Sequence, residues 1–285
     1  MINKLCIIGV GLIGGSLACA LKAQNACNTI VGYGRHPANL QRALELQVID
    51  AYYTEIQPAI QGADMILVAV PLGAMASVFA QIKPHLAENA IVTDVGSAKQ
   101  SVIEAAKSVF GADTPFLVPA HPIAGLEKSG VEAAIATLFT NRRVIITPLP
   151  ENPPAVVETV RWMWQQTGAI VDTMTAQHHD EVLAATSHLP HILAYCLVDT
   201  LARMDEHTEI FQFAAGGFRD FTRIAASDPT MWHDICIANQ PALTKVLARF
   251  QQELTQLSSW IEQQQGPELL TVFQRAKAER DQFTG

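Results

Sequence analysis

The sequence predicts an α/β fold in which a doubly wound, mostly parallel sheet is followed by an all-α helical domain. Through the first half of the 285-residue chain, short apolar runs rich in β-branched residues alternate with helical stretches, which is typical of parallel strands buried on both faces. From about Thr175 the strand signal disappears and the pattern is helical, with Pro190 and Pro229 as breaks. We therefore expect a sheet domain over residues 1–173 and a helical domain over residues 174–285.

Seven apolar runs of the first domain are expected to be strands of one parallel sheet. Each run is short, and a helical stretch separates it from the next, as the crossover connections of a parallel sheet require. The runs cover residues 5–9, 30–33, 65–70, 91–94, 116–119, 144–147 and 169–172.

A glycine-rich turn joins the first expected strand to the helix that follows it. Gly9, Gly11 and Gly14 form the pattern G-x-G-x-x-G. Gly9 permits a tight turn, Gly11 lets backbone N–H groups approach a pyrophosphate, and Gly14 allows the helix to pack closely on the strand. The helix N-terminus adds a partial positive charge. The alternative is a tight turn that holds no ligand. The pattern favours a Rossmann-type dinucleotide site at Gly9, Gly11, Leu12, Ile13 and Gly14.

The end of the second expected strand indicates which dinucleotide binds. An Asp or Glu at this position would accept a hydrogen bond from the ribose 2′-hydroxyl of NAD. This chain has Gly34 and Arg35 there, and a guanidinium can pair with the 2′-phosphate of NADP. NADP is therefore the favoured cofactor, and NAD is the alternative if Arg35 is only a solvated loop charge. Val70 and Pro71, at the end of the 65–70 strand, are also expected to contact the cofactor.

Composition and charge exclude several classes of protein. Nearly half of the residues are hydrophobic (49%) and the formal net charge is −8, so the chain is globular and offers no basic surface to nucleic acid. The five cysteines are scattered without disulfide or zinc spacing. The N-terminus enters a strand at once, without a signal-like segment, and no run of about 18 apolar residues offers a membrane span. We therefore expect a cytoplasmic protein that binds neither nucleic acid nor a membrane.

Polar residues follow the strands at the edge of the sheet where ligands bind. In doubly wound folds this is the edge formed by the carboxyl ends of the strands. His121 comes directly after one strand. Its ordinary pKa suits a group that accepts the proton of an alcohol as hydride leaves carbon. The alternative is a hydrogen-bonded structural histidine.

The helical half holds two further groups of polar residues. His188 and His191 lie one helical turn apart and share a face, and Pro190 between them is expected to kink the helix. Arg219 or Arg223, beside a Gly-Gly break, is suited to clamp a carboxylate; the alternative is a structural ion pair with a nearby aspartate. No spacing among the histidines and carboxylates matches a known ligand set, so no metal site is predicted.

One helix near the C-terminus carries a heptad-like seam of apolar residues. Its members step by four and three residues in alternation, as the a and d positions of a coiled coil do. Such a seam packs either within the subunit or across the two-fold axis of a homodimer. The seam consists of Leu243, Leu247, Phe250, Leu254, Leu257 and Ile261.

Five motifs, which span nearly the whole chain, together resemble those of the prephenate and arogenate dehydrogenases of tyrosine biosynthesis. The resemblance implies a Rossmann-type domain, a helical domain that makes a homodimer, and an active site in the cleft between them. In chain order the motifs are residues 9–16 (GVGLIGGS), 94–99 (DVGSAK), 121–125 with 127–130 (HPIAG and EKSG), 187–191 (SHLPH) and 217–223 (GFRDFTR).

The resemblance also implies roles for individual residues. His121 is similar to the catalytic histidine that binds the ring C4 hydroxyl, with Ser97 as its hydrogen-bonding companion. Arg223 resembles the arginine that holds a substrate carboxylate. Leu126 departs from the family, because it stands where Thr or Ser is common, and a hydroxyl hydrogen bond is missing there. The residues implied to bind the substrate are Ser187, His188, His191, Arg223 and Trp232.

The implied substrate is a small dicarboxylate, a cyclohexadienol that is oxidised and decarboxylated. His121 accepts the hydroxyl proton while hydride leaves C4 and CO2 leaves C1. The sequence leaves open whether the side chain is a keto acid, as in prephenate, or an amino acid, as in arogenate. Two other functions stay open as well: another dehydrogenase or imine reductase of this architecture, and a protein that senses NAD(P) without catalysis. Ser97, His121 and Arg223 together argue against the sensor, which needs none of them.

Overall fold

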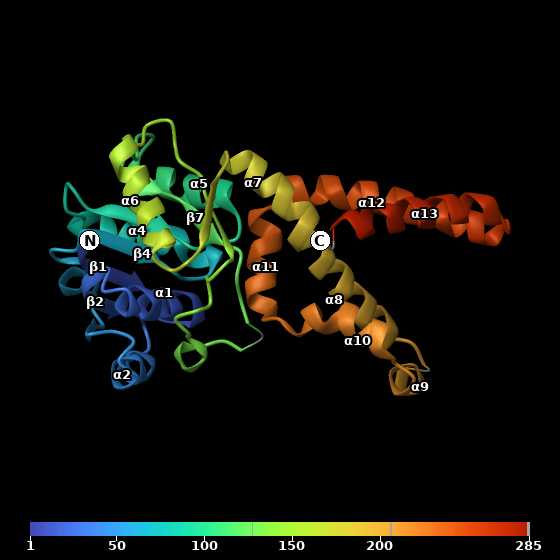
Figure 1. Ribbon diagram of the computed structural model, residues 1–285, viewed down its shortest axis with the longest axis horizontal. Helices are drawn as coiled ribbons and strands as arrows, with labels where there is room; N and C mark the ends of the chain where they lie inside the picture. Colours follow the sequence, from blue (N-terminus) through green and yellow to red (C-terminus); the bar gives the residue numbers. More distant parts are fainter. Residues whose placement is uncertain (127, 206, 284–285) are drawn as a thin grey trace. The chain divides into compact units, whose positions relative to one another are not determined.

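The computed structural model describes residues 1–126, 128–205 and 207–283. Its contacts divide the chain into two compact units, residues 1–239 and residues 240–285, which are described separately (Figure 1). The expected boundary between residues 173 and 174 falls inside the first unit and stays a prediction. Glu127, in the motif that follows His121, lies outside the described residues.

A six-stranded parallel sheet forms the centre of the first unit and confirms the predicted fold class. The strand order β3-β2-β1-β4-β5-β6 is that of a doubly wound dinucleotide-binding sheet. The order reverses between β1 and β4, whose last residues Ile8 and Val68 are paired in register. Ligands bind at such a point of reversal. The strands are β1 (Ile2–Ile8), β2 (Cys27–Tyr33), β3 (Ala51–Tyr53), β4 (Met65–Val68), β5 (Ile91–Asp94) and β6 (Leu117–Val118).

Burial on both faces explains why the strands read as continuous apolar runs. In β1, Leu5 and Ile7 pack into one hydrophobic cluster, and Cys6 and Ile8 pack into another. The helical elements of this half are α1 (Leu12–Ala23), α2 (Pro37–Glu45), α3 (Ile56–Ile60), η1 (Leu72–Ala74), α4 (Met75–Ile82), η2 (Lys83–His85), α5 (Lys99–Phe110), η3 (Val131–Ala133) and α6 (Pro154–Gln165). Helices α1 and α6 contribute to the first cluster, and α4 and α5 to the second, so the sheet is covered on both sides (Figure 1).

Two of the expected strands belong to a second, smaller sheet. β7 (Ala120–Pro122) pairs antiparallel with β8 (Arg143–Ile146), which pairs in parallel with β9 (Ile170–Thr173). The prediction that residues 144–147 and 169–172 extend one parallel sheet is therefore wrong. Apolar strand patterns show that a segment is extended and buried, but they do not show which neighbour it pairs with.

The strand expected over residues 116–119 is divided at Pro119. β6 ends at Val118 in the first sheet, and β7 begins at Ala120 in the second. Proline has no N–H to donate to a ladder, so a strand is readily interrupted there. The division places His121 on the second sheet rather than at the end of the first. The sequence also missed β3, which is too short to show a periodic pattern.

A long helical stretch follows the second sheet. α7 (Ala176–Leu183), the π-helical turn η4 (Ala184–His188) and α8 (Leu189–Ala202) run on without a gap. Pro190 lies in the first turn of α8, directly after the π-helical turn. A π-helical turn already departs from the i to i−4 hydrogen-bond ladder, which accommodates a residue without an N–H.

By length and composition alone, residues 176–202 form a helix that is apolar enough to cross a membrane. The sequence expectation concerned an uninterrupted run of about 18 apolar residues, and polar residues such as His179, Asp180 and His188 interrupt this stretch. A helix in a protein core or an interface passes the same test. This one carries the buried His179, Asp180 and His188, which bond to other parts of the protein, yet only 28% of its most apolar stretch is buried.

The first unit ends with four short helical elements: α9 (His207–Gln212), α10 (Gly216–Thr222), η5 (Arg223–Ala226) and α11 (Pro229–Ala238). Asp228 caps α11, because its Oδ1 accepts a hydrogen bond of 2.8 Å from the N–H of Met231. This cap and Pro229 define the start of the helix that carries Trp232.

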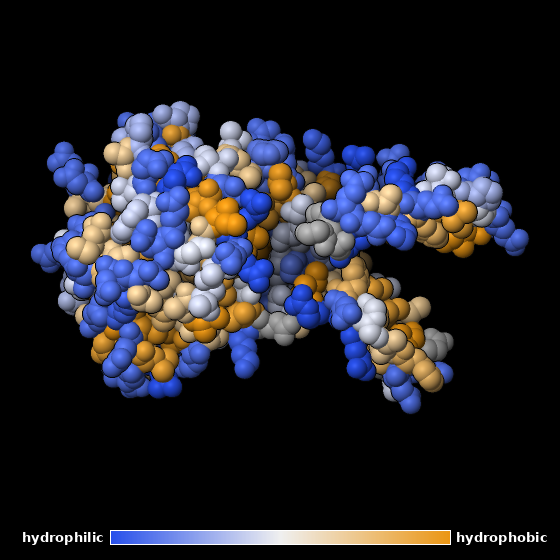
Figure 2. Space-filling view, in the orientation of Figure 1, coloured by the Kyte–Doolittle hydropathy of each residue, from blue (hydrophilic) through white to orange (hydrophobic). Residues whose placement is uncertain are grey.

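The second unit consists of two helices that pack on each other, α12 (Gln240–Glu262) and α13 (Gly266–Phe283). The apolar seam that begins at Leu243 and ends at Ile261 lies within α12, as expected. Leu254 and Ile261 of the seam remain 55% and 63% exposed, and α13 adds Leu270 and Phe273, which are exposed to a similar extent. Figure 2 shows apolar surface on this helical pair.

Candidate active site

The glycine turn between β1 and α1 leaves room for a phosphate. At Gly9, where φ is +95°, a Cβ would lie 2.3 Å from the carbonyl oxygen of Ala69, and at Gly14 a Cβ would lie 2.6 Å from the carbonyl oxygen of Gly9. These two glycines are required by close packing. At Gly11, the N-cap of α1, a Cβ would meet nothing within 4 Å. The open space therefore lies directly before the N-terminus of a twelve-residue helix, as a pyrophosphate site requires.

The other expected cofactor residues surround the same edge of the sheet. Val70 and Pro71 follow β4, and Val70 packs against the glycine turn, since its Cγ1 would lie 3.2 Å from a Cβ at Gly9. Gly34 and Arg35 follow β2, and Arg35 is exposed before the start of α2. These residues fit a bound dinucleotide: the glycine turn and α1 would hold its pyrophosphate, and the end of β2 would face its adenosine ribose.

His121 is the first member of a buried chain of hydrogen bonds. Its Nδ1 lies 2.9 Å from Nε2 of His179, whose Nδ1 lies 2.8 Å from Oδ1 of Asp180. A carboxylate only accepts hydrogen bonds, so the proton of neutral His179 is on Nδ1 and its Nε2 is an acceptor. Nδ1 of His121 must then be the donor, which leaves Nε2 of His121 with a free lone pair. Asp180 thus sets the tautomer of His121 through His179, and the free nitrogen is suited to accept a proton.

Asp180 also ties the helical stretch to the sheet. Its two carboxylate oxygens accept hydrogen bonds from the N–H groups of Lys99 (2.7 Å) and Gln100 (2.9 Å), the first residues of α5. The N-cap residue of α5, Ala98, has no side chain that could cap the helix. Asp180 therefore supplies the cap from another part of the chain, at the positive end of the α5 dipole.

A buried ion pair supports the strand that carries His121. Nζ of Lys99 lies 2.5 Å from Oδ2 of Asp94 and 2.6 Å from the carbonyl oxygen of Ala120. Oδ1 of Asp94 accepts a hydrogen bond from the N–H of Ala120. Both side chains of the pair are fully buried. The backbone on the N-terminal side of His121 is therefore held from both its N–H and its C=O.

The environment of His121 keeps the imidazole neutral. Burial, together with the neighbouring His179, Lys99 and His188, lowers the pKa of His121 well below 6.5. Burial also lowers the pKa of His179, against the opposing effect of Asp180, and lowers the pKa of His188 to about 4. All three side chains are therefore uncharged near neutral pH, which is the state that a proton acceptor requires.

These pKa shifts predict how stability depends on pH. The histidines gain protons near pH 6.5 in the unfolded chain but only at lower pH in the folded protein, so the unfolded state binds more protons below about pH 6.5. The free energy of unfolding is expected to be constant between about pH 7 and 8 and to fall as the pH drops from about 6.5 to 5. Urea titrations across this range measure the effect. A free energy that is independent of pH there would contradict the burial of neutral histidines.

His188 is held by Asn239, which the sequence did not single out. Nδ2 of Asn239 donates hydrogen bonds to the carbonyl oxygen of Asp180 (2.8 Å) and to Nδ1 of His188 (3.0 Å). Nδ1 of His188 is thus an acceptor, and the proton of the neutral ring is on Nε2. Within the described residues, the buried Nε2 of His188 and Nε1 of Trp232 have no hydrogen-bond partner. Both are N–H donors, so the site offers hydrogen bonds to an acceptor-rich ligand.

His191 and Trp232 form an aromatic wall. Their rings stack with centroids 3.7 Å apart and an angle of 20° between the planes, and the His188 ring meets Trp232 edge-on at 6.0 Å. Nδ1 of His191 lies 2.8 Å from the carbonyl oxygen of Ser187, which makes Nδ1 the donor. Burial, with the positive charge of Arg223, lowers the pKa of His191.

The structure brings together most of the expected site residues. His121, His188, His191 and Trp232 are linked through ring contacts and the His179–Asp180–Asn239 hydrogen bonds, whereas Arg223 is exposed in η5. Within the described part of the chain, the side chain of His121 forms its hydrogen bond with His179. The expected hydrogen bond between Ser97 and His121 stays a prediction. The sequence presents the remaining histidines and carboxylates only as possible metal ligands, and gives His179 and Asp180 no role. Only the structure shows that His179 bonds to His121 and that Asp180 bonds to His179. The sequence assigned no role to His179, Asp180 or Asn239, nor to Asp94 and Lys99, which it singled out only as ends of the 94–99 motif.

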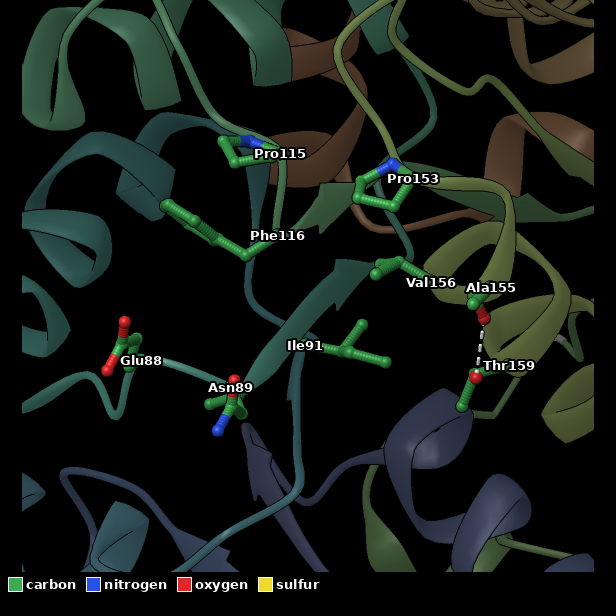
Figure 3. A pocket seen from close by; sticks show the side chains of 10 residues that line it. Glu88, Asn89, Ile91, Pro115, Phe116, Pro153, Ala155, Val156 and Thr159 are labelled. Carbon is green, nitrogen blue, oxygen red and sulfur yellow. Dashed lines mark hydrogen bonds between the residues drawn. The ribbon is translucent and has the colours of Figure 1, made fainter.

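A separate hollow of about 340 Å³ lies at the opposite end of the sheet. Figure 3 shows that Ile91, the first residue of β5, and Phe116 and Val156 line it. Ile91 is at the amino end of its strand, whereas ligands of doubly wound sheets bind at the carboxyl ends. Its lining is mainly apolar side chains and backbone, so this hollow does not carry the chemistry of the site.

Comparisons with known proteins match both halves of the chain to one family. Residues 17–173 match the family model described as prephenate dehydrogenase, nucleotide-binding domain, and residues 175–275 match prephenate dehydrogenase, dimerization domain. The chain is 39% identical over 280 residues to the cyclohexadienyl dehydrogenase of Zymomonas mobilis, covering 98% of this chain and 95% of that protein.

Two solved structures are also similar. The prephenate dehydrogenase of Aquifex aeolicus, solved in complex with hydroxyphenyl propionate and NAD+, has 33% identity and a TM-score of 0.92, with 99% of each chain covered. The arogenate dehydrogenase of Synechocystis has 30% identity and a TM-score of 0.83, with 98% of this chain and 99% of that chain covered.

Proposed function

Because the chain belongs to the prephenate dehydrogenase family, we propose that it catalyses the NAD(P)-dependent oxidative decarboxylation of prephenate, arogenate or both. The products are 4-hydroxyphenylpyruvate and tyrosine, respectively. The observation that carries the proposal is the buried chain of His121, His179 and Asp180, because it gives His121 a basic nitrogen in a defined tautomer. Initial rates with both substrates and both cofactors test it. Absence of turnover with all four pairs would refute it.

In the reaction, the nicotinamide, when bound, accepts the hydride that leaves ring carbon C4. Nε2 of His121 accepts the proton of the C4 hydroxyl as the hydride departs. CO2 leaves C1, the electrons of the broken C–C bond enter the ring, and the ring becomes aromatic. The product is a phenol, so the proton returns from His121 to the oxygen. Aromatisation makes the step irreversible.

The His179–Asp180 pair supports this proton transfer. When His121 holds the proton, its Nδ1–H donates to His179, which in turn donates to the Asp180 carboxylate. The negative charge at the end of the chain stabilises an imidazolium that burial alone would disfavour. Asp180 is itself held by the start of α5, so the arrangement is in place before the substrate binds.

The substrate carboxylates and side chain are assigned to the helical half. Arg223 supplies a guanidinium that suits a carboxylate, and the donors on His188 and Trp232 suit oxygen acceptors. Ser187 and His191 complete the set that the family resemblance implies. Ser97 is assigned to the same site because it lies in the turn between β5 and α5, next to the Asp94–Lys99 pair.

The position of Arg35 predicts a preference for NADP over NAD. An exposed guanidinium pairing with the 2′-phosphate supports a ratio of about tenfold in kcat/KM, equivalent to about 1.4 kcal/mol. Arg35→Ala is expected to abolish the preference, and Gly34→Asp to reverse it by repelling the phosphate. A Cβ at Gly34 would meet only Leu40 at 3.6 Å or more, so the aspartate fits. Arg42→Ala, a nearby exposed arginine, is the control. A wild type that favours NAD, with Arg35→Ala indistinguishable from it, would contradict this assignment.

A homodimer through the helical half is also proposed. It is supported by the dimerization-domain match, by the apolar helix over residues 176–202, of whose most apolar stretch only 28% is buried, and by the exposed part of the α12 seam. Leu254→Glu is expected to give a monomer in sedimentation velocity, since a charge would be buried in the interface. Gln256→Glu, on another side of α12, should stay dimeric. A monomeric wild type would overturn the proposal.

The proposed location is the cytoplasm. All five cysteines are free in the structure, and Cys6 is deeply buried, which raises the pKa of its thiol to about 12. A chain that keeps unpaired thiols is suited to a reducing compartment.

A further inference from the structure

Besides the bonds that Asp180 and His179 make, one more hydrogen bond joins the helical half to the cofactor side of the site. Oδ2 of Asp234, in α11, accepts a hydrogen bond of 3.1 Å from the N–H of Gly73 in η1. α11 packs against η1 around this bond. The Asp234 side chain is 18% exposed, so the carboxylate is largely shielded from water. His233, which is exposed, contacts the other oxygen of the same carboxylate at 3.0 Å.

On the cofactor side, η1 is continuous with the residues that pack against the glycine turn. It follows Val70 and Pro71 directly, and Ala69 and Val70 contact the turn at Gly9. Leu72 of η1 also packs against the turn between β5 and α5, since its Cδ2 would lie 2.7 Å from a Cβ at Gly96. Movement of η1 would therefore disturb both turns that face the cofactor.

On the substrate side, α11 carries two parts of the proposed substrate site. Trp232 stacks on His191, and Asn239, at the end of the helix, holds His188 and the carbonyl oxygen of Asp180. Movement of α11 would therefore disturb the aromatic wall and the tautomer of His188.

We infer that Asp234 is a positioning residue that keeps η1 docked on α11, so that the cofactor half and the substrate half of the site are already closed on each other before either ligand binds. This inference rests on the proposed function only in its choice of substrate analogue. A protein whose binding-competent state is fully populated binds each ligand with its intrinsic affinity. If the contact is lost, the first ligand must also close the site, and the second then binds a site that is already closed.

The test is a set of dissociation constants measured by fluorescence titration of the full chain. NADP+ and NAD+ are each titrated alone and in the presence of saturating hydroxyphenyl propionate. In wild type the analogue is expected to change the cofactor Kd by less than about twofold. In Asp234→Asn the cofactor Kd alone is expected to rise by about tenfold, the effect of one charge-assisted hydrogen bond, and saturating analogue should restore the wild-type value.

Gly73 provides a second route to the same contact. The three nearest atoms to a Cβ at Gly73 all belong to Asp234, the closest being Oδ2 at 2.8 Å. Gly73→Ala is therefore expected to push the carboxylate away and reproduce the Asp234→Asn effect. In an Asp234→Ala background the same alanine meets no such obstacle and should have no further effect on Kd, a strongly non-additive cycle. Thr230→Ala, an exposed change on α11, is the matched control and should bind like wild type.

Two outcomes would overturn the inference. If the cofactor Kd of Asp234→Asn and Gly73→Ala equals that of wild type, the contact has no effect on closure. If the Kd rises but the analogue does not restore it, the change has damaged the cofactor site locally. Failure of hydroxyphenyl propionate to bind wild type would count against the proposed substrate class instead. In that case the cofactor Kd values of Gly73→Ala, Asp234→Ala and the double variant still test the inference. Additive effects on the cofactor Kd, or no effect on it, would overturn the inference.

Discussion

Replacing His121 with asparagine is expected to lower kcat by at least about a hundredfold while leaving the Kd of the cofactor unchanged. Asparagine is polar and smaller than histidine, but it has no nitrogen that accepts a proton near neutral pH. Its side chain can still meet His179, so the buried hydrogen-bond chain is not left without a partner. Steady-state rates and cofactor fluorescence titrations measure the two quantities.

The pH profile of the wild type gives an independent check on His121. The pKa of His121 lies well below 6.5, mainly through burial, so kcat/KM should stay level down to about pH 6 and fall only at lower pH. His178→Asn is the matched control, because His178 is exposed beside His179 and is not a member of the His121–His179–Asp180 hydrogen-bond chain. Turnover of His121→Asn within a few-fold of wild type would reduce His121 to a structural residue.

Replacing Lys99 with methionine is expected to lower the free energy of unfolding by about 3 kcal/mol, or Tm by roughly 6–12 °C. The change removes the cation of a fully buried pair and leaves the Asp94 carboxylate without it. The N–H groups of Gly96 and Ala120 still donate to Asp94, which keeps the loss near the lower end of the range for such pairs. Urea unfolding monitored by circular dichroism measures it.

Lys107→Met on the same helix is the control for Lys99→Met. Lys107 pairs with Glu151 at 3.9 Å and is 42% exposed, so its loss should change the free energy of unfolding by less than about 0.5 kcal/mol. Equal stability of Lys99→Met and Lys107→Met would mean that the buried pair contributes no more than a surface pair. Activity is a further readout, because Lys99 also holds the carbonyl oxygen of Ala120 beside His121.

The fold class could be predicted because its signals are local. A strand buried on both faces must be apolar at every position, as Leu5 to Ile8 are, and the helices between strands show their own periodicity. Local sequence signals do not show which strands pair with each other. The residues of β8 and β9 are as apolar as those of the main sheet, and only their hydrogen-bond partners place them in a second sheet.

The cofactor turn could be predicted for a related reason. Gly9 and Gly14 are required by contacts with the strand and turn beside them, and Gly11 is required to leave a space open. All three constraints act within one strand-turn-helix unit, so they leave a fixed spacing in the sequence.

The proton-accepting chain is different, because its members are far apart in sequence. His121 and His179 are 58 residues apart, and Asp180 and Lys99 are 81 residues apart. Packing of α7 against α5, together with the second sheet, brings them together. No spacing rule connects such residues, so the sequence does not distinguish His179 and Asp180 from an ordinary polar run. Only the structure shows their hydrogen bonds to His121 and to each other.

The sequence by itself determined the doubly wound sheet, the dinucleotide turn, the helical second half and the family, since each of these leaves residues of a required kind at short, regular intervals. Only the tertiary structure decided which strands pair, which histidine orients His121, and that Asp234 reaches Gly73 across 161 residues. The physical reason is that hydrogen-bond partners and tautomers are set by directions and distances of about 3 Å, which depend on how separate elements pack rather than on the order of residues within any one of them.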